Sequence, residues 1–486
     1  MLLTLDGLGP RYTQITRALI DAIRRGTLAP GGRAPSTREL AVDLGCSRNL
    51  VLLAYEQLIL EGYFVSQPRG GTYVAPDLPL RFTDAASAQS PAPPRARVTL
   101  SSGGRRIVQA ASRVSDAVRY KPYSAIDFIY GLCEPDDGLL RQFRHALLRP
   151  LRDRAFSYGD PAGDLELRRE IAKRLRSARG ISRSPDQIVL TSGTQQALDI
   201  CARVLLGDGI RAVMEDPGYD VADAIFRAAG ATILPARVDR DGLDPACLPT
   251  DRSRVGMVYV TPSHQFPTGA VMPAARRFAL LDWARRTRAF VFEDDYDGEF
   301  RYEGQPIPAL AGLDPEVVIY CGTFAKSLFP SCRLGYLALP HALVRPIVEC
   351  KWLADRGNSR LVEGAIRELL ATGHYDRHIR RMQRRYRARC AVLERSLQKH
   401  LGDAVEVRGS SAGLHLVAWL PSLPRGRITD IIQGCLARSI GVYPVDRYSA
   451  RPLGAGLLLG YGLVEIDDID RGVRGLAESY RQVCGR

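Results

Sequence analysis

Apolar residues near the N-terminus recur at helical spacing. Within residues 11–25 they lie at Ile15, Leu19 and Ile23, one every fourth position, which predicts an amphipathic helix. Gly26 follows this segment and predicts its end. The chain is therefore expected to begin with a helix that buries one face.

Two further helices are predicted, with a tight turn between them. Ser36 and Glu39 have the spacing of a capping box, at the start of a short helix that runs to Val42. The turn 44–46 then leads to a second helix, which has Ser47 as its N-cap. This order is typical of a helix-turn-helix, in which the first residues of the second helix contact base edges in the major groove.

A β-hairpin is predicted after these helices. Residues 63–65 and 72–74 are strand-like, and they flank a turn, Gln67–Gly71, that contains a single arginine. A hairpin in this position is typical of the wing of a winged helix-turn-helix. Spacing alone leaves one alternative open, a small helical domain that mediates protein contacts.

A change in composition separates this unit from the rest of the chain. Residues 76–123 are basic, rich in Pro, Ala and Ser, and poor in periodicity, which predicts an extended, flexible connector. Beyond it, strand-like apolar runs such as 188–190 and 289–292 alternate with helical segments, which predicts a parallel α/β sheet. The expected domains are therefore residues 1–75 and 124–486.

Composition and charge refine this picture only slightly. The 486 residues are 45% hydrophobic, enough for more than one core, and the net charge of +14 is weak evidence for a polyanionic partner. The sequence has neither a signal peptide nor an apolar run long enough to span a bilayer, so we expect a cytoplasmic protein without a membrane partner. The ten cysteines are scattered and show no zinc-ligand spacing, so no metal site is expected.

One lysine in the C-terminal part has unusual surroundings. Lys326 follows the apolar run 317–322 and lies among small and apolar residues, with Thr323 before it and Arg333 after it. A lysine desolvated in such a pocket can lose its proton and form a Schiff base with an aldehyde. Pyridoxal 5'-phosphate has this need, and it also requires a carboxylate opposite its pyridine nitrogen and a phosphate site.

Both requirements are met upstream of Lys326. Asp294 and Tyr296 follow a buried strand, at the carboxyl end where α/β proteins bind ligands, so Asp294 can hold the pyridine nitrogen protonated and Tyr296 can reach the phenolic oxygen. Residues 191–198 predict a strand end, a glycine turn and a helix start, whose free N–H groups suit a phosphate. Each element alone is a weak signal, but their order and spacing together are specific.

The N-terminal unit resembles the DNA-binding domain of GntR-family regulators. The stretches PSTRELA, LGCSRNLV and AYEQL carry the resemblance, which covers nearly all of residues 11–75. Ala34 and Leu50 depart from the family pattern, in which Leu and Thr are usual. The resemblance implies that the unit binds double-stranded operator DNA through Arg38, Ser47, Arg48, Asn49 and, in the wing, Arg69 and Gly71.

The chain from about residue 126 onward resembles the fold-type I aminotransferases, and with its head it is similar to the MocR/GabR-type regulators. The stretches LTSGTQQALDI, YVTPSHQFPTG, FEDDYDGEF and GTFAKSLFPSCRLGY carry the resemblance. It implies an N-terminal winged helix-turn-helix of α+β class and a C-terminal α/β PLP-dependent transferase fold, in a homodimer joined through the C-terminal domain. The implied cofactor residues are Lys326 for the Schiff base, Asp294 and Tyr296 for the ring, Tyr219 for stacking, Gly193, Thr194, Thr323 and Arg333 for the phosphate, and Tyr158 from the second subunit.

Two departures from the aminotransferase pattern bear on function. Phe266 stands where an asparagine usually contacts the ring oxygen, and Leu458 falls where an arginine usually clamps the substrate carboxylate. Arg447, in a nearby loop, is the candidate anchor for an effector carboxylate, the alternative being a solvent-exposed loop arginine.

The expected function is transcription regulation. In this interpretation the aminotransferase-like domain senses pyridoxal phosphate or a small amino compound and so alters operator binding. The alternatives are a working aminotransferase that carries a DNA-binding head and, third, a pyridoxal-phosphate store without DNA activity.

Overall fold

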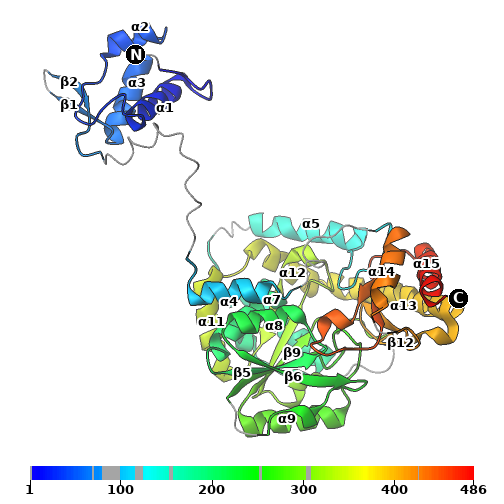
Figure 1. Cartoon of the computed structure of the whole chain (residues 1–486). Helices are drawn as coiled ribbons and strands as arrows, with labels where there is room; N and C mark the ends of the chain where they lie inside the picture. Colours follow the sequence, from blue (N-terminus) through cyan, green and yellow to red (C-terminus); the bar gives the residue numbers. More distant parts are fainter. Residues whose placement is uncertain are drawn as a thin grey trace. The chain divides into compact units, whose positions relative to one another are not determined.

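The computed structural model describes residues 3–67, 70–78, 99–114, 124–152, 157–250, 254–302, 308–424 and 426–485. They form two compact units, Met1–Thr99 and Leu100–Arg486, and each is described by itself (Figure 1).

The N-terminal unit is a winged helix-turn-helix. Its elements are α1 (Arg11–Arg24), α2 (Thr37–Asp43), α3 (Arg48–Leu60), β1 (Phe64–Gln67) and β2 (Gly71–Val74). The predicted apolar face of α1 packs on α3, with Leu19, Val51 and Leu58 fully buried in one core. The Tyr55 hydroxyl donates to the backbone oxygen of Pro35 at 2.7 Å and so fixes the loop that precedes α2.

The two helix starts of the helix-turn-helix differ. At α2 the predicted capping box is confirmed, since Ser36 Oγ accepts from the backbone N–H of Glu39 at 3.2 Å and Glu39 Oε2 accepts from that of Ser36 at 3.1 Å. Ser47 occupies the N-cap position of α3, but its side chain makes no capping hydrogen bond, so that part of the prediction is wrong. Instead, Arg48 Nε donates to Thr37 Oγ1 at 3.3 Å and ties the start of α3 to α2.

The predicted connector contains a helix that its composition did not indicate. Helix α4 (Ser102–Ala111) packs against α8 (Asp220–Ala228), with Ala110 buried and Arg106 Nη1 3.2 Å from Asp208 Oδ1. An isolated helix of this length is marginal in water, so α4 depends on the surface of α8. The domain boundaries at residues 75 and 124 stay predictions.

An eight-stranded sheet is the centre of the C-terminal unit. Its order is β4-β11-β10-β9-β8-β5-β6-β7; the strands β10, β9, β8, β5 and β6 run parallel, whereas β11 is antiparallel to both neighbours. Figure 1 shows α7 and α8 on one side of the sheet and α9 on the other, and each face has its own apolar core. The strands and these helices are β4 (Ile188–Thr191), α7 (Thr194–Leu205), β5 (Arg211–Asp216), β6 (Thr232–Asp239), β7 (Gly242–Leu243), β8 (Val255–Val260), α9 (Ala274–Thr287), β9 (Phe290–Asp295), β10 (Val318–Thr323) and β11 (Gly335–Ala338).

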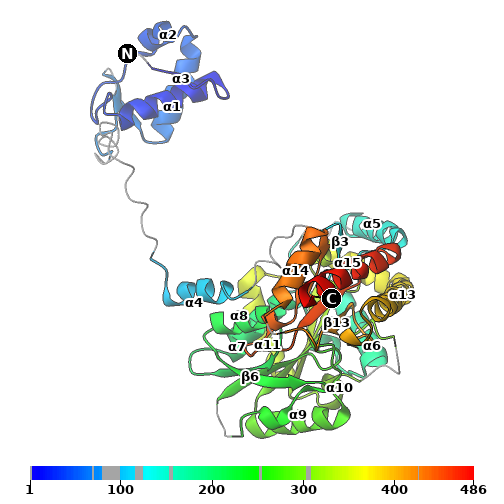
Figure 2. The same cartoon turned by 45° about the vertical axis from the view of Figure 1, so that its right-hand side comes forward.

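A smaller, antiparallel sheet of order β12-β13-β16-β15 adjoins it. Helices α13, α14 and α15 lie beside this sheet in Figure 2 and share its apolar core. The bounds are α13 (His374–Leu401), β12 (Glu406–Arg408), β13 (His415–Trp419), α14 (Ile428–Ala437), β15 (Tyr443–Pro444), β16 (Gly456–Gly460) and α15 (Ile466–Cys484). The remaining elements are β3 (Ile126–Asp127), α5 (Asp137–Arg152), α6 (Leu165–Arg179), α10 (Leu310–Leu313), α11 (His341–Asp355), α12 (Arg360–Ala371), β14 (Ile440–Gly441) and short 3-10 turns. Within the described ranges no helix has the length and apolar character needed to cross a membrane.

Loss of the capping box should loosen α2. Ser36→Ala removes the acceptor for the Glu39 N–H, and we expect the local stability of α2 to fall by about 1 kcal/mol. Hydrogen exchange of the amides in 37–43, followed by mass spectrometry, measures this change. Ser66→Ala, on the exposed side of β1, is the control and should leave exchange unaltered. Equal protection in both variants would contradict the role of the cap.

Candidate cofactor and effector site

A pocket of about 530 Å³ lies at the carboxyl ends of β4, β9 and β10. The predicted site residues among its lining are Gly193, Thr194, Tyr219, Asp294, Tyr296, Thr323, Lys326, Arg333 and Arg447. Tyr158 does not line the pocket of its own chain; it is 80% exposed and lies beside Arg356, whose Cζ is 5.3 Å from the ring centre. Its predicted contact involves a second subunit.

The Asp294 carboxylate, at the end of β9, has one oxygen paired and one unpaired. Tyr259, on the adjacent strand β8, donates its hydroxyl to Asp294 Oδ2 at 2.8 Å, while Oδ1 is buried and has no hydrogen-bond partner in the part of the chain that the structure describes. Burial raises the pKa of Asp294 to about 7. A protonated ring nitrogen would supply the missing donor and favour the carboxylate form.

Lys326 lies in the loop that follows β10. Its Nζ donates to the backbone oxygen of Gly131, and burial lowers the pKa of the amine. A lowered pKa increases the neutral fraction, and only the neutral amine can attack an aldehyde carbon.

An anion-binding corner lies beside these two groups. Gly193, with φ of +93°, directly precedes α7. The first backbone N–H groups of α7 point toward the N-terminal end of this helix, and the pocket lies at that end. The Arg333 guanidinium is close, since a Cβ at position 193 would lie 3.7 Å from its Nη1. Thr323 is buried next to Lys326 and accepts from the Ala325 N–H at 3.1 Å. With the unpaired Asp294 oxygen and the buried amine, this corner fits pyridoxal phosphate.

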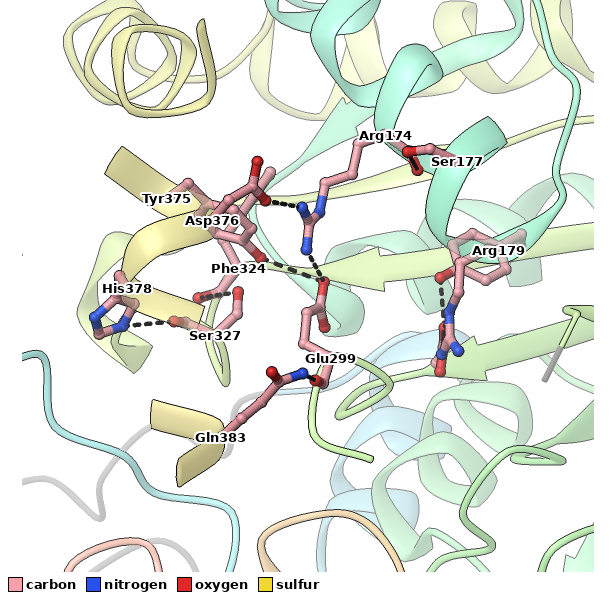
Figure 3. Close-up of polar contacts among 12 residues, drawn as sticks. Arg174, Ser177, Arg179, Glu299, Phe324, Ser327, Tyr375, Asp376, His378 and Gln383 are labelled. Atoms are coloured by element: carbon pink, nitrogen blue, oxygen red, sulfur yellow. Dashed lines mark hydrogen bonds and ion pairs between the residues drawn. The ribbon is translucent and has the colours of Figure 1, made fainter. Parts of the chain in front are cut away.

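A polar network from α6 and α13 supports the segments that carry Asp294 and Lys326 (Figure 3). On one side, Arg179 pairs with Asp295, the neighbour of Asp294, with Nε 2.6 Å from Oδ2. On the other, His378 Nε2 lies 3.1 Å from the backbone oxygen of Ser327, the neighbour of Lys326. Both segments are therefore fixed by helices outside the sheet.

Between these two supports, Glu299 joins α6 to α13 in Figure 3. Tyr375 donates its hydroxyl to Glu299 Oε1 at 3.3 Å, and Gln383 donates to the Glu299 backbone oxygen at 2.6 Å. Arg174 pairs with Asp376. These contacts hold the turn after β9 against α13.

Sequence reasoning missed a buried cluster formed by His264, Asp297 and His415, whose ligand atoms lie within 4.8 Å of one another; His415 also lines the pocket. His264 Nδ1 is 2.8 Å from Asp297 Oδ2, and Tyr296 donates its hydroxyl to the His264 backbone oxygen at 3.0 Å. The pKa of His264 is raised, because the effect of the Asp297 carboxylate outweighs the opposing effect of burial. The pKa of His415 is held well below its usual range by burial and by the charge of His264. Hydrogen bonds within the protein thus occupy these groups, and no sequence spacing connects the three.

The predicted DNA-contacting residues lie at the start of α3 and on α2. Arg38, Ser47, Arg48 and Asn49 are exposed, and so is Gly71 at the start of β2. Gly71 has φ of +100°, a conformation that favours glycine. Arg69 lies outside the described residues. The side chain of Arg33, which sequence reasoning did not select, lies close to Gly71 and so belongs to the wing.

Comparisons with known proteins agree with both units. Residues 133–443 match the family of class I and II aminotransferases, and residues 11–74 match the bacterial regulatory proteins of the gntR family. The chain is 34% identical to the uncharacterized HTH-type transcriptional regulator YhdI of Bacillus subtilis, over 97% of this chain and 96% of the relative. It is also 34% identical to the probable rhizopine catabolism regulatory protein MocR of Rhizobium meliloti, over 97% of this chain and 94% of that protein.

Solved structures share the fold of the C-terminal unit. Kynurenine aminotransferase of Pyrococcus horikoshii superposes with a TM-score of 0.68 at 26% identity, covering 79% of this chain and 95% of that one. The fold and the pocket thus define an aminotransferase-type domain joined to a winged helix-turn-helix. The chain belongs to the HTH-type transcriptional regulators of the gntR family that carry an aminotransferase domain, and it is a DNA-binding regulator.

Asp294→Asn should stabilise the cofactor-free protein at high pH. The pKa of Asp294 is about 7 in the folded chain against an ordinary value of 3.8, so this group costs folding stability that increases as pH rises from about 4 to about 7. Asparagine carries no such cost. The Tm of the variant should therefore exceed that of the wild type by more at about pH 8 than at about pH 5.

The same variant should bind pyridoxal phosphate more weakly, by about 1.5 to 3 kcal/mol, because a charged hydrogen bond is lost. Asp446→Asn, on the exposed surface, is the control for both measurements. A Tm gain independent of pH would show that Asp294 is not the group that titrates.

Proposed function

We propose that this regulator binds pyridoxal phosphate in the pocket around Lys326 and that an amino compound reaching the bound cofactor alters operator binding. The observation that carries the proposal is a buried amine near a buried carboxylate with an unpaired oxygen, in a chain whose other unit is a DNA-binding head. A small molecule that binds more tightly when the heads are in one arrangement than in another shifts the equilibrium between the two arrangements. The coupling free energy is typically about 1 to 3 kcal/mol.

Each predicted residue has a defined part in this proposal. Lys326 would bond covalently to the cofactor, Asp294 Oδ1 would accept a hydrogen bond from its ring nitrogen, and Tyr219 would stack on the ring. When bound, pyridoxal phosphate supplies an aldehyde carbon that exchanges amines and a ring that withdraws electrons. The residues that hold its outer groups are Tyr296 at the phenolic oxygen, Gly193, Thr194, Thr323 and Arg333 at the phosphate, and Tyr158 of a second subunit.

The oligomeric state and the location follow from the same proposal. A homodimer joined through the C-terminal unit brings two heads to two half-sites of a double-stranded operator, as helix-turn-helix dimers do. Each head would use Arg38, Ser47, Arg48 and Asn49 in the major groove, with Arg69 and Gly71 at the backbone or minor groove. The place of action is the cytoplasm.

A working aminotransferase is the second candidate function. Lys326 and Asp294 are the minimum that transamination requires, and both line the pocket. A pyridoxal-phosphate store without DNA activity is disfavoured by the winged helix-turn-helix with its confirmed capping box.

Lys326→Ala separates regulator from enzyme. Without the amine, the cofactor cannot bond covalently, so borohydride treatment should leave no adduct by mass spectrometry. The head does not contain Lys326, so operator binding should persist, while the reporter response to pyridoxal phosphate and amines disappears. Lys399→Ala, a mostly exposed lysine of α13, is the control. Normal regulation with loss of turnover alone would favour the enzyme.

Arg48→Ala should weaken specific operator binding. If its side chain reads a base edge, the loss is about 1 to 3 kcal/mol on an operator selected in vitro, with a much smaller loss on random duplex. Gel-shift titrations at two salt concentrations measure both. Arg24→Ala, on the exposed end of α1, is the matched arginine control. An equal loss on both duplexes would assign Arg48 to phosphate contact.

A further inference from the structure

We propose that Lys351 positions the site for the cofactor's phosphate, through a buried hydrogen-bond network that holds both segments of the chain assigned to a phosphate. The inference rests on the proposed function, which takes Gly193 and Thr194 as phosphate residues and Tyr158 as the residue that reaches the phosphate of a second subunit. Lys351 does not line the pocket, so it acts on the cofactor only through other residues.

Lys351, on α11, is a buried cation. Its side chain is fully buried, which is rare for lysine, because an ammonium group that loses its hydration needs acceptors in place of water. The three N–H groups of the ammonium have three acceptor residues: Nζ lies 3.2 Å from Gln196 Oε1, 2.9 Å from Asp355 Oδ2 and 2.9 Å from Asn358 Oδ1. The charge is therefore the centre of a polar network.

Two of these acceptors also hold Ser192, the residue that precedes Gly193. Gln196 Oε1 accepts from the Ser192 backbone N–H at 2.7 Å, and Asn358 Oδ1 accepts from the Ser192 hydroxyl at 3.2 Å. A phosphate at a helix start is bound by backbone N–H groups, whose directions depend on the turn that leads into the helix. Lys351 thus fixes the turn into α7 without contacting the phosphate itself.

The segment 355–360, where α11 ends and α12 begins, connects the network to the second phosphate residue. Two of the three acceptors of Lys351 belong to this segment. On its other side, Arg360 Nη1 donates to Ser157 Oγ at 3.3 Å, next to Tyr158. One buried charge therefore supports the phosphate turn of its own subunit and the segment that carries Tyr158.

A phosphate-free ligand separates this role from a general contribution to folding. Pyridoxal has the ring and the aldehyde of pyridoxal phosphate, with a hydroxyl group in place of the phosphate ester. A network that only stabilises the fold affects the binding of both ligands alike. A network that positions the phosphate site affects pyridoxal phosphate and leaves pyridoxal unchanged.

The test measures the phosphate preference of the full chain, defined as the dissociation constant of pyridoxal divided by that of pyridoxal phosphate. Both constants come from titrations that follow the visible absorption of the bound ligand. Residues that orient the ligands of a metal contribute about 10- to 100-fold to its affinity, and we expect Lys351→Met to lower the phosphate preference by a similar factor. The affinity for pyridoxal should stay at the wild-type value.

A second variant keeps the ammonium. Gln196→Met breaks the link between Lys351 and Ser192 but leaves Lys351 paired with Asp355 and Asn358, so this variant decides the test if Lys351→Met does not fold. It should also lower the phosphate preference. The double variant should lose no more than Lys351→Met alone, because residues of one network are not additive.

The control is Arg183→Met. Arg183 is also buried, and its Nη2 donates to the backbone oxygen of Val318 at 3.3 Å, at the end of β10 away from the pocket. Its replacement should lower the Tm and leave the phosphate preference unaltered.

Three outcomes would contradict the proposals. A phosphate preference that survives Lys351→Met, or survives Gln196→Met where the lysine variant does not fold, would overturn this inference and leave the proposed function intact. An equal loss of preference in Arg183→Met would assign the effect to stability and overturn it as well. A wild-type protein that takes up no pyridoxal phosphate would contradict the proposed function, and this inference with it.

Discussion

The cofactor pocket depends on buried polar atoms that have no hydrogen-bond partner among the residues that the structure describes. Burying a charged group is costly unless another group pairs with it. Arg179 and Asp295, beside the sheet, form such a pair. In the pocket, Asp294 Oδ1 and the Nε and Nη2 of Arg447 have no hydrogen-bond partner among the described residues. The pocket therefore contains buried charged groups that a ligand must pair, and the positions of these groups specify where the ligand's donors and acceptors must lie.

Local signals in the sequence were sufficient wherever a single segment determines the structure. The Ser36–Glu39 capping box, the helix spacing of Ile15 and Leu19, and the position of Asp294 at a strand end depend on neighbours along the chain, and the structure reproduces them. The spacing at Ser47 predicted the helix start but not the absence of a capping bond. Capping positions and capping bonds are thus separate predictions.

Interactions between distant segments were not predictable from one sequence. Tyr259 became the partner of Asp294 because β8 pairs with β9, and no spacing signal reports the order of strands. The cluster of His264, Asp297 and His415 likewise joins His415 to two residues that lie more than a hundred positions before it. For the same reason the sequence could not predict whether Arg447 is exposed to solvent or lines a pocket, because only the fold decides which way a loop faces.

The docking of α4 on α8 affects the chain that joins the two units. The first residues of α8, Asp220 and Val221, line the pocket, and the same helix supports α4 along its side. The ten residues of α4 span about 15 Å as a helix and about 33 Å when extended. The span of these ten residues is thus not a constant of the sequence: it is shorter by about 18 Å whenever the surface of α8 holds them in helical form.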